Sequence, residues 1–358
     1  MWAIDICIGN EVFIFISHHG KNFHTRISFT YIYRLILNYS MITYLRFGDN
    51  LEIDEDIDTK KVIELVNSKK ETWIDVVAEP KKGISEILKS IFPDYHSLIL
   101  EDITESTRPK MEKYDGFVFI VLKTYPFGTF KHSQISIVLG KTFLLTVRDS
   151  SSDLSKVVDV LRAGKSHTAD FVLYKLFESI FDNHYHVLES VDSKIDRFES
   201  RSLKRPKPAT LKEILDLKKK LHGMHKILLS EREVVLCLSR GNVTQIRQKT
   251  AVFMRDISDD VIALIDMEET YREALSGNIE LYMSSVNNSM NEVMKTLTII
   301  ASFTFVPALI AGFYGMNIRL PFQELRNDGM DYYYVFVLAV MFSAVGYLYL
   351  LFKKRDWL

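Results

Sequence analysis

Cysteine is nearly absent from this sequence, which contains only two cysteines among 358 residues. A disulfide framework and a cysteine-rich zinc or iron–sulfur site are therefore excluded. An excess of charge of one sign is also lacking, because 45 lysines and arginines balance 46 aspartates and glutamates. Without a basic excess, nothing in the overall charge indicates a nucleic-acid partner. The length allows two domains, or three.

The motifs of common enzyme families are missing as well. The sequence contains no GxxxxGK[ST] loop, GxGxxG fingerprint, HExxH or GxSxG motif. His222 and His225, three positions apart on a predicted helix, could hold a metal. No third ligand is evident, so we expect a solvated pair of histidines. The sequence therefore predicts a protein without enzymatic chemistry.

Two long uncharged runs stand near the C-terminus. Residues 296–318 include 23 positions without a charge, and residues 332–352 include 21 more. Each run can cross a hydrocarbon core of about 30 Å as a helix. Two buried helices of a soluble protein are the alternative, but such helices rarely run so long without a charged face. We therefore predict two membrane spans.

Basic residues set the expected orientation of these spans. Lys353, Lys354 and Arg355 come directly after the second run. The positive-inside bias then places the C-terminus in the cytoplasm, and two spans place the N-terminal part there too. We expect a multi-pass protein of the cell (inner) membrane with both termini cytoplasmic.

The expected domains are based on strand and helix signals along the chain. Alternating or β-branched runs at 72–79, 116–125 and 133–149 predict strands, and helical spacing fills the gaps between them. Residues 1–40 lack the pattern of a signal peptide and differ in composition from the rest of the chain, with Met41 a candidate natural start. The full division is an extension outside the folded unit (1–40), an α/β domain (41–165), a helical hairpin (166–243), a stalk helix with the first span (244–314), an outer loop (315–332), the second span (333–352) and a basic tail (353–358).

One apolar stripe runs through the stalk helix into the first span. Its residues succeed one another at steps of three or four, which keeps them on one helical face. They are Ile257, Val261, Leu264, Met267, Tyr271, Leu275, Ile279, Tyr282, Val286, Met290, Met294 and Leu297. One chain of this size cannot bury so long a helix, so we expect it to pack against copies of itself or a partner.

Two spans per chain cannot enclose a water-filled path, so a pore requires a ring of chains. The stalk helix would line its axis, with a polar ring at Asn291 and an apolar constriction that could gate by dewetting. The expected pore-lining residues are Asn291, Met294, Leu297, Ala301, Phe305, Ala308 and Gly312. From spacing alone, ordinary helix packing through the small residues of this set is an equal alternative.

The segment 310–317, IAGFYGMN, resembles the signature of the CorA family of magnesium channels, with Tyr-Gly-Met-Asn at the outer end of the first of two C-terminal spans. Residues 284–301 resemble the family's inner pore helix, and residues 101–114 resemble its cytosolic Glu-Asp…Arg-Pro-Lys segment. The terminal KKRDWL resembles its basic tail, so the likeness covers about residues 41–358.

This resemblance implies a homopentamer with a cytosolic funnel and a peripheral second span. It assigns Gly315, Met316 and Asn317 to the selectivity filter. Magnesium gives up its water reluctantly, so neutral Asn317 amide oxygens and Gly315 carbonyls would accept hydrogen bonds from the hydrated ion without trapping it.

The resemblance also implies regulatory Mg²⁺ bound between subunits. By position, the matching acids are Asp256 on the stalk helix and Glu101 with Asp102 on the funnel, and Asp182 is a further candidate. The sequence departs from the family elsewhere. Many relatives have threonine where Ala308 stands and methionine where Phe305 stands.

The sequence therefore predicts an α+β membrane protein that assembles as a homopentameric funnel. Its predicted function is passive Mg²⁺ influx, with Mg²⁺ as both transported and regulatory ion. The alternatives are a transporter of the same family for Co²⁺, Ni²⁺ or Zn²⁺, and a membrane-anchored coiled scaffold that binds a protein partner.

Overall fold

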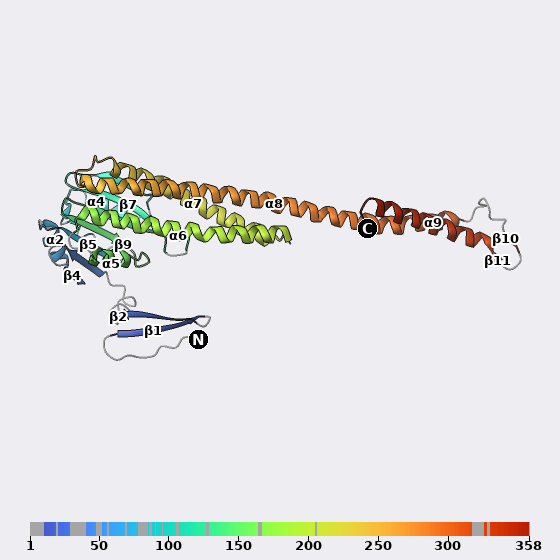
Figure 1. Cartoon of the computed structure of the whole chain (residues 1–358), viewed down its shortest axis with the longest axis horizontal. Helices are drawn as coiled ribbons and strands as arrows, with labels where there is room; N and C mark the ends of the chain where they lie inside the picture. The colour runs from blue at the N-terminus through green and yellow to red at the C-terminus, as the bar shows by residue number, and fades with distance from the viewer. Residues whose placement is uncertain are drawn as a thin grey trace. The chain divides into compact units, whose positions relative to one another are not determined.

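The computed structural model (Figure 1) describes the whole chain except residues 1–10, 19–20, 29–40, 48–51, 56, 69, 78–84, 86–87, 90, 95, 105–106, 127–128, 164–166, 205, 317–325, 328–329 and 358. The chain forms two compact units. Unit 1 comprises Met1–Arg197 with Ile214–Leu275, and unit 2 comprises Phe198–Glu213 with Ser276–Leu358.

A mixed sheet of seven strands forms the centre of unit 1, in the order β4-β3-β5-β9-β8-β7-β6. The pairing is antiparallel throughout except between β5 and β9, which are parallel. The strands are β3 (Met41–Arg46), β4 (Glu52–Glu55), β5 (Thr72–Val77), β6 (Lys110–Lys113), β7 (Val118–Thr124), β8 (Ser133–Leu139) and β9 (Phe143–Arg148). The three predicted strand regions are therefore confirmed, with 133–149 forming the β8–β9 hairpin.

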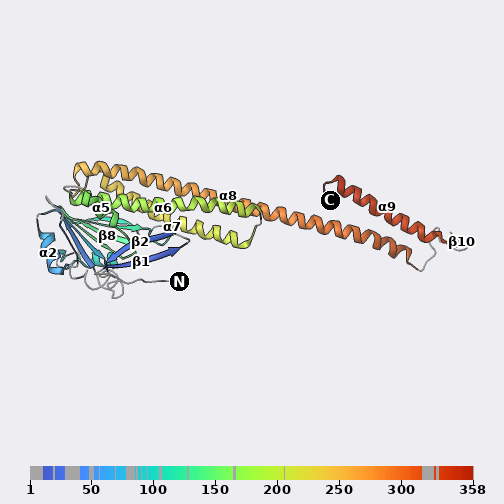
Figure 2. The same ribbon diagram turned by 60° about the horizontal axis from the view of Figure 1, so that its bottom comes forward.

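The sheet is covered on both faces, as the apolar strand β7 illustrates. Phe119 and Val121 share one apolar cluster with side chains of α2 (Thr59–Asn67) and α4 (His96–Thr104). Ile120 points to the opposite face and is also fully buried. Figures 1 and 2 show the long helices α6 (Ala169–Lys204) and α7 (Pro208–Ser239) running alongside the sheet. Burial on both sides explains why this strand reads as a continuous apolar run rather than as an alternating one.

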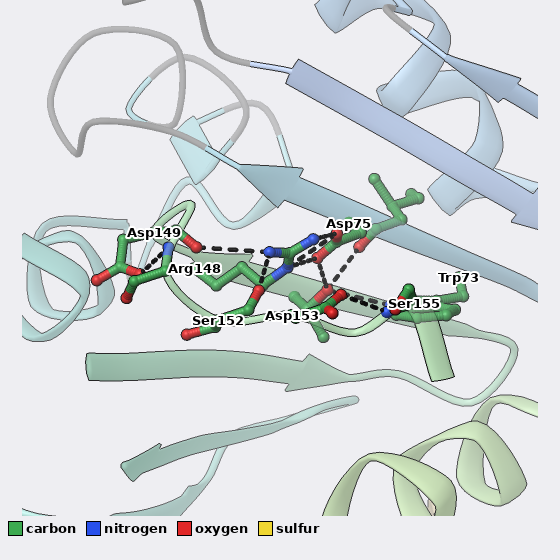
Figure 3. Close-up of polar contacts among 10 residues, drawn as sticks. Trp73, Asp75, Arg148, Asp149, Ser152, Asp153 and Ser155 are labelled. Atoms are coloured by element: carbon green, nitrogen blue, oxygen red, sulfur yellow. Dashed lines mark hydrogen bonds and ion pairs between the residues drawn. The ribbon is translucent and has the colours of Figure 1, made fainter. Parts of the chain in front are cut away.

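A buried ion pair joins the parallel strands β5 and β9 (Figure 3). The Arg148 guanidinium donates to the Asp75 carboxylate at 2.9 and 3.1 Å, and the Thr146 hydroxyl donates to the same carboxylate at 2.6 Å. Arg148 also donates to the Ser152 carbonyl oxygen ahead of α5 (Ser155–Ala163). Because one guanidinium binds both Asp75 and the Ser152 backbone, this network holds the sheet to the next helix along the chain.

Three long helices come after the sheet. They are α6, α7 and α8 (Gln248–Tyr314). The segment 166–243 contains the two long helices that the sequence indicates, and the predicted uninterrupted third helix is confirmed, although it begins at 248 rather than 244. Its 67 residues correspond to about 100 Å at 1.5 Å per residue. The division of the chain into these domains stays a prediction.

Within unit 2, α9 (Tyr332–Lys354) packs against the C-terminal half of α8. The Phe303 and Phe352 rings lie 5.9 Å apart, and the Lys295 ammonium donates to the Asp356 carbonyl oxygen at 2.9 Å. The short strands β10 (Arg326–Asn327) and β11 (Met330–Asp331) precede α9. The sequence indicates no strand in this half of the chain, because two-residue strands lack a periodic pattern.

The N-terminal segment contributes a separate two-stranded sheet, β1 (Glu11–His18) with β2 (Lys21–Ser28). Among the described residues these strands pair only with each other. The assignment of residues 1–40 to a segment outside the folded unit stays a prediction.

Candidate functional site

The expected pore-lining residues form one exposed line along the second half of α8. Unit 2 leaves every one of them at its surface, including large apolar side chains. They are Asn291, Met294, Leu297, Ala301, Phe305, Ala308 and Gly312. A row of exposed apolar side chains with one polar position requires lipid or other protein surface to cover it.

The helix α9 lies on the opposite side of α8 from this line. Lys295, Ile299 and Phe303 are partly buried, and Lys295 and Phe303 make the two contacts with α9 and the residues after it. At 100° per residue, these positions project about half a turn away from Leu297 and Phe305. One chain therefore covers one face of its first span and leaves the candidate pore face open.

The C-terminal end of α8 is set by Gly315. Its N–H donates to the Ala311 carbonyl oxygen at 2.8 Å, and helical geometry ends directly before it at Tyr314. A β-carbon at position 315 would lie 2.8 Å from that same oxygen. Met316 is half exposed, whereas Asn317, the predicted selectivity residue, lies outside the described residues. Gly315 is therefore the residue that lets the chain leave the helix at the Gly-Met-Asn motif.

A second candidate site is an acidic face on α6 and α8 within unit 1. Asp182 and Asp256, both predicted sensor acids, are exposed there and lie close to Asp260. Partial burial, together with the charges of Asp182 and Asp256, raises the pKa of Asp260. Burial and a hydrogen bond to Glu178 raise the pKa of Tyr174 to about 12. The repulsion among these carboxylates favours a bound cation.

The other two predicted sensor acids lie apart from this face. The Asp102 carboxylate forms an ion pair with the Lys110 ammonium at 2.7 Å, and Glu101 is exposed on α4. Burial alone would lower the pKa of Lys110, but its hydrogen bonds to Asp102 and Glu112 raise it. Within the described part of one chain, no group of three acids, histidines or cysteines has the geometry to hold a metal. A sensor that combines all four acids would need a second chain.

The pair His222 and His225 is not a solvated pair, which corrects the expectation from spacing. Only His222 is exposed, whereas the His225 Nδ1 lies 2.6 Å from the fully buried Glu268 carboxylate of α8. Sequence spacing shows the two histidines but not the partner, because Glu268 lies 43 positions away on another helix.

Sequence reasoning also missed Asp260 and Glu178. The available signal was the spacing of four between Glu178 and Asp182 and between Asp256 and Asp260, which places each pair on one helical face. It could show two acidic stripes, but it could not show that the stripes face each other.

These features define a class of protein. Two helices are long and apolar enough to cross a membrane, the most apolar stretch of each is not buried in the described structure, and one of them extends from a large α/β unit. The chain is a membrane protein with a large water-soluble part.

The family model of CorA-like Mg²⁺ transporter proteins matches residues 68–354, and the chain belongs to this family. It is 33% identical over 333 residues to the cobalt/magnesium transport protein CorA of Thermotoga maritima. This match covers 90% of this chain and 92% of the relative. The protein of the same name from Methanocaldococcus jannaschii is 25% identical over 293 residues, 80% of this chain and 91% of the relative.

A solved structure of the Methanocaldococcus jannaschii CorA magnesium transporter has the same fold. It matches with a TM-score of 0.72 at 23% identity and covers 88% of this chain and 98% of its own. The predicted resemblance is thereby confirmed, and so is the fold class of the single chain, whereas the homopentamer stays a prediction. Because members of the family are transporters or channels, the prediction that the chain is not an enzyme is confirmed as well.

Proposed function

We propose that this protein is a channel for passive Mg²⁺ influx, built from a ring of five copies. The observation that carries the proposal is the open face of α8 opposite α9, with its line of exposed residues from Asn291 to Gly312. A ring of copies brings these faces together around an axis and leaves α9 at the periphery. The exposed apolar line then becomes the wall of a pore rather than a lipid contact.

This exposed line supplies the two features that a path for a hydrated cation requires, namely a polar ring and apolar rings. Asn291 contributes an amide to a polar ring, while Met294, Leu297 and Phe305 form apolar rings. Rings of apolar side chains can close a pore by expelling water from it. The membrane potential drives entry at about 2.3 kcal/mol per elementary charge per 100 mV, so no nucleotide site is needed.

Selectivity is proposed to reside in Gly315, Met316 and Asn317. Gly315 ends the helix at the outer mouth, which allows Asn317 to offer an amide oxygen from every copy. A neutral acceptor attracts the ion's own water molecules and releases them readily, whereas a ring of carboxylates would hold the ion longer.

Regulation is proposed to use the acidic face of Asp182, Asp256 and Asp260, with Asp102 and Glu101 contributed by the adjacent copy. Mg²⁺ between these acids would relieve their repulsion and favour a tight, closed ring. Five sites of about 1 kcal/mol each would give roughly 5 kcal/mol, close to the 5.5 kcal/mol that changes a 1:99 ratio to 99:1. The channel would then close as cytosolic Mg²⁺ rises.

The proposed location is the cell (inner) membrane, with both termini in the cytoplasm. Lys353, Lys354 and Arg355 directly after the second span support this orientation through the positive-inside bias. Residues 315–332 then form the loop on the far side.

Cobalt is the second candidate ion, because the Thermotoga maritima relative is a cobalt/magnesium transport protein. Nickel and zinc are further alternatives within the family. Ion flux into liposomes that contain the purified protein and an indicator for each ion distinguishes these candidate ions. It also separates a channel from a membrane-anchored scaffold, which would pass none of the ions.

The sharpest variant is Asn317→Ala, with Asn242→Ala as the matched control in an exposed turn of unit 1. We expect Asn317→Ala to assemble normally and to lose most Mg²⁺ flux, while the control keeps it. Wild-type flux and ion preference in Asn317→Ala would contradict the selectivity assignment.

A further inference from the structure

Arg247 lies directly before α8 and joins three parts of unit 1. Its guanidinium donates to the buried Asp170 carboxylate of α6 at 2.7 Å and also to the Glu71 carboxylate. Glu71 comes directly before β5, and its other carboxylate oxygen accepts the Ala169 N–H at the start of α6 at 2.9 Å. The three side chains Glu71, Asp170 and Arg247 therefore form a clamp between the sheet, α6 and α8.

The clamp also caps the N-terminal end of α8 from another helix. The first turn of α8 contains no acid, although a carboxylate there stabilises the free N–H groups of a helix. Asp170 of α6 fills this role, because its carboxylate accepts the Arg247 N–H at 3.0 Å. Burial alone would raise the pKa of Asp170, but hydrogen bonds from two threonines and from Arg247 lower it. An ionised group of α6 therefore holds the start of α8.

Directional contacts distinguish the clamp from the apolar packing of the same helix. Ile257 and Val261 of α8 are buried in unit 1, but apolar contact has no preferred direction. Charge-assisted hydrogen bonds are directional, and one guanidinium that binds two carboxylates adds a geometric constraint. The clamp is therefore suited to fix the position and rotation of α8 relative to α6.

An aromatic contact continues from the clamp toward the acidic face. About one turn beyond the clamp on α6, the Tyr174 ring stacks on the Phe253 ring of α8 with their centroids 5.2 Å apart. The Tyr174 hydroxyl donates to Glu178 at 2.9 Å, and the charges of Asp256 and Asp260 act on this same hydroxyl. A continuous series of contacts between α6 and α8 thus leads from the clamp to the acids.

We propose that the clamp positions the acidic face. It holds α8 against α6 so that Asp256 and Asp260 stay close to Asp182, and the repulsion among the three carboxylates is maintained. Without the clamp, the two helices can shift at this end and the carboxylates move apart. This inference rests on the proposed function, in which Mg²⁺ relieves that repulsion, and it makes the clamp the part of the chain that sets the response to Mg²⁺.

A double-mutant cycle in EDTA tests this coupling without any metal. Positions 247 and 260 are 13 residues apart in sequence, which is about 20 Å along a helix. Changes at sites so far apart, without a shared partner, normally affect stability additively. Arg240→Met, which removes an exposed arginine directly after α7, provides the control.

We expect Asp260→Asn to raise the melting temperature of the full-length protein in detergent and EDTA, because it removes one of the repelling charges. The same change should have the same effect in the Arg240→Met background. In the Arg247→Met background its effect should largely disappear, because the carboxylates have already moved apart. Equal shifts in all three backgrounds would overturn the proposal.

A milder variant serves if Arg247→Met, which leaves the buried Asp170 without its cation, does not fold. In Glu71→Gln, the amide oxygen still accepts the Ala169 N–H, while the charge that holds Arg247 to the sheet is lost. Asp260→Asn should then raise the melting temperature less than it does in wild type. An undiminished shift in Glu71→Gln would likewise overturn the proposal.

Titration with Mg²⁺ separates a failure of this inference from a failure of the proposed function. Wild type and Arg240→Met should gain thermal stability as Mg²⁺ rises, whereas Arg247→Met should need several-fold more Mg²⁺ for half of its gain. Equal requirements for Mg²⁺ in wild type and Arg247→Met would overturn the role of the clamp alone. A wild-type protein that gains nothing from Mg²⁺ would contradict the proposed sensor and, with it, any role of the clamp in the response to Mg²⁺.

Discussion

The two halves of α8 present the same kind of apolar stripe to entirely different surroundings. In unit 1, Ile257, Val261 and Leu264 are between 0% and 3% exposed. In unit 2, Leu297 is 59% and Phe305 is 65% exposed. The difference teaches that one chain completes the core of its water-soluble unit alone, whereas its membrane half leaves apolar side chains for lipid or another protein surface to cover.

The largest expected effect comes from truncating one apolar side chain in each half of α8. Leu264→Ala should lower the free energy of unfolding of the water-soluble unit by about 2–5 kcal/mol, because the cavity stays inside a packed core. Leu297→Ala should leave that free energy unchanged and alter Mg²⁺ flux instead. Denaturation and liposome flux on both variants provide the comparison. A destabilised water-soluble unit in Leu297→Ala would show that the two halves are not separate.

A comparison of one buried and one exposed ion pair, with a buried effect of similar size, tests the same difference between the two units. Arg148→Met leaves the buried Asp75 carboxylate, 9% exposed, without its partner and should cost about 3–5 kcal/mol. Arg201→Met breaks the pair with Glu213 in unit 2, whose side chains are 45% and 50% exposed, and should leave the free energy of unfolding nearly unchanged. Chemical denaturation measures both, and equal costs would contradict the burial argument.

The smallest expected effect concerns the acidic face. Asp260 has a raised pKa, so its ionised form is disfavoured in the folded protein, and stability should rise as pH falls through that pKa. Asp260→Asn should remove this part of the pH dependence and raise the melting temperature in chelator by a few degrees at most. Added Mg²⁺ should stabilise the variant less than wild type.

The exposed Asp216 on α7 offers the control, Asp216→Asn, which should behave as wild type. An Asp260→Asn variant that gains as much from Mg²⁺ as wild type does would remove Asp260 from the sensor. The stability of Asp216→Asn should also match the wild-type pH profile.

Periodicity explains which parts of this structure could be predicted from the sequence. The uncharged runs and the steps of three and four residues predicted α8 and α9 almost to their ends, because these signals are local. The strands β5, β7, β8 and β9 were found through their β-branched composition. The strand order, with parallel β5 and β9, depends on contacts between residues about 70 positions apart, such as Asp75 with Arg148.

The candidate sites differ in the same way, because some carry a local sequence signal and others depend on contacts between distant residues. The Gly-Met-Asn motif is contiguous and identified the family, whereas spacing alone left a pore face and ordinary helix packing as equal alternatives for the second half of α8. Glu231 and Glu268 gave no signal, because a buried acid looks like a surface acid in sequence. Their roles arise only when α6, α7 and α8 bring His184 and His225 against them.

Cysteine accessibility along α8 tests the central claim most directly. In a background without the native Cys7 and Cys237, single cysteines replace Leu297, Ala301 or Phe305 on the open face, and Ile299 or Phe303 on the α9 face. We predict that a charged, thiol-reactive reagent labels the open-face cysteines in the lipid-embedded protein and blocks Mg²⁺ flux, while the α9-face cysteines stay unlabelled. Labelling and block at positions 299 and 303, with none at 297, 301 and 305, would contradict a pore lined by the open face of α8.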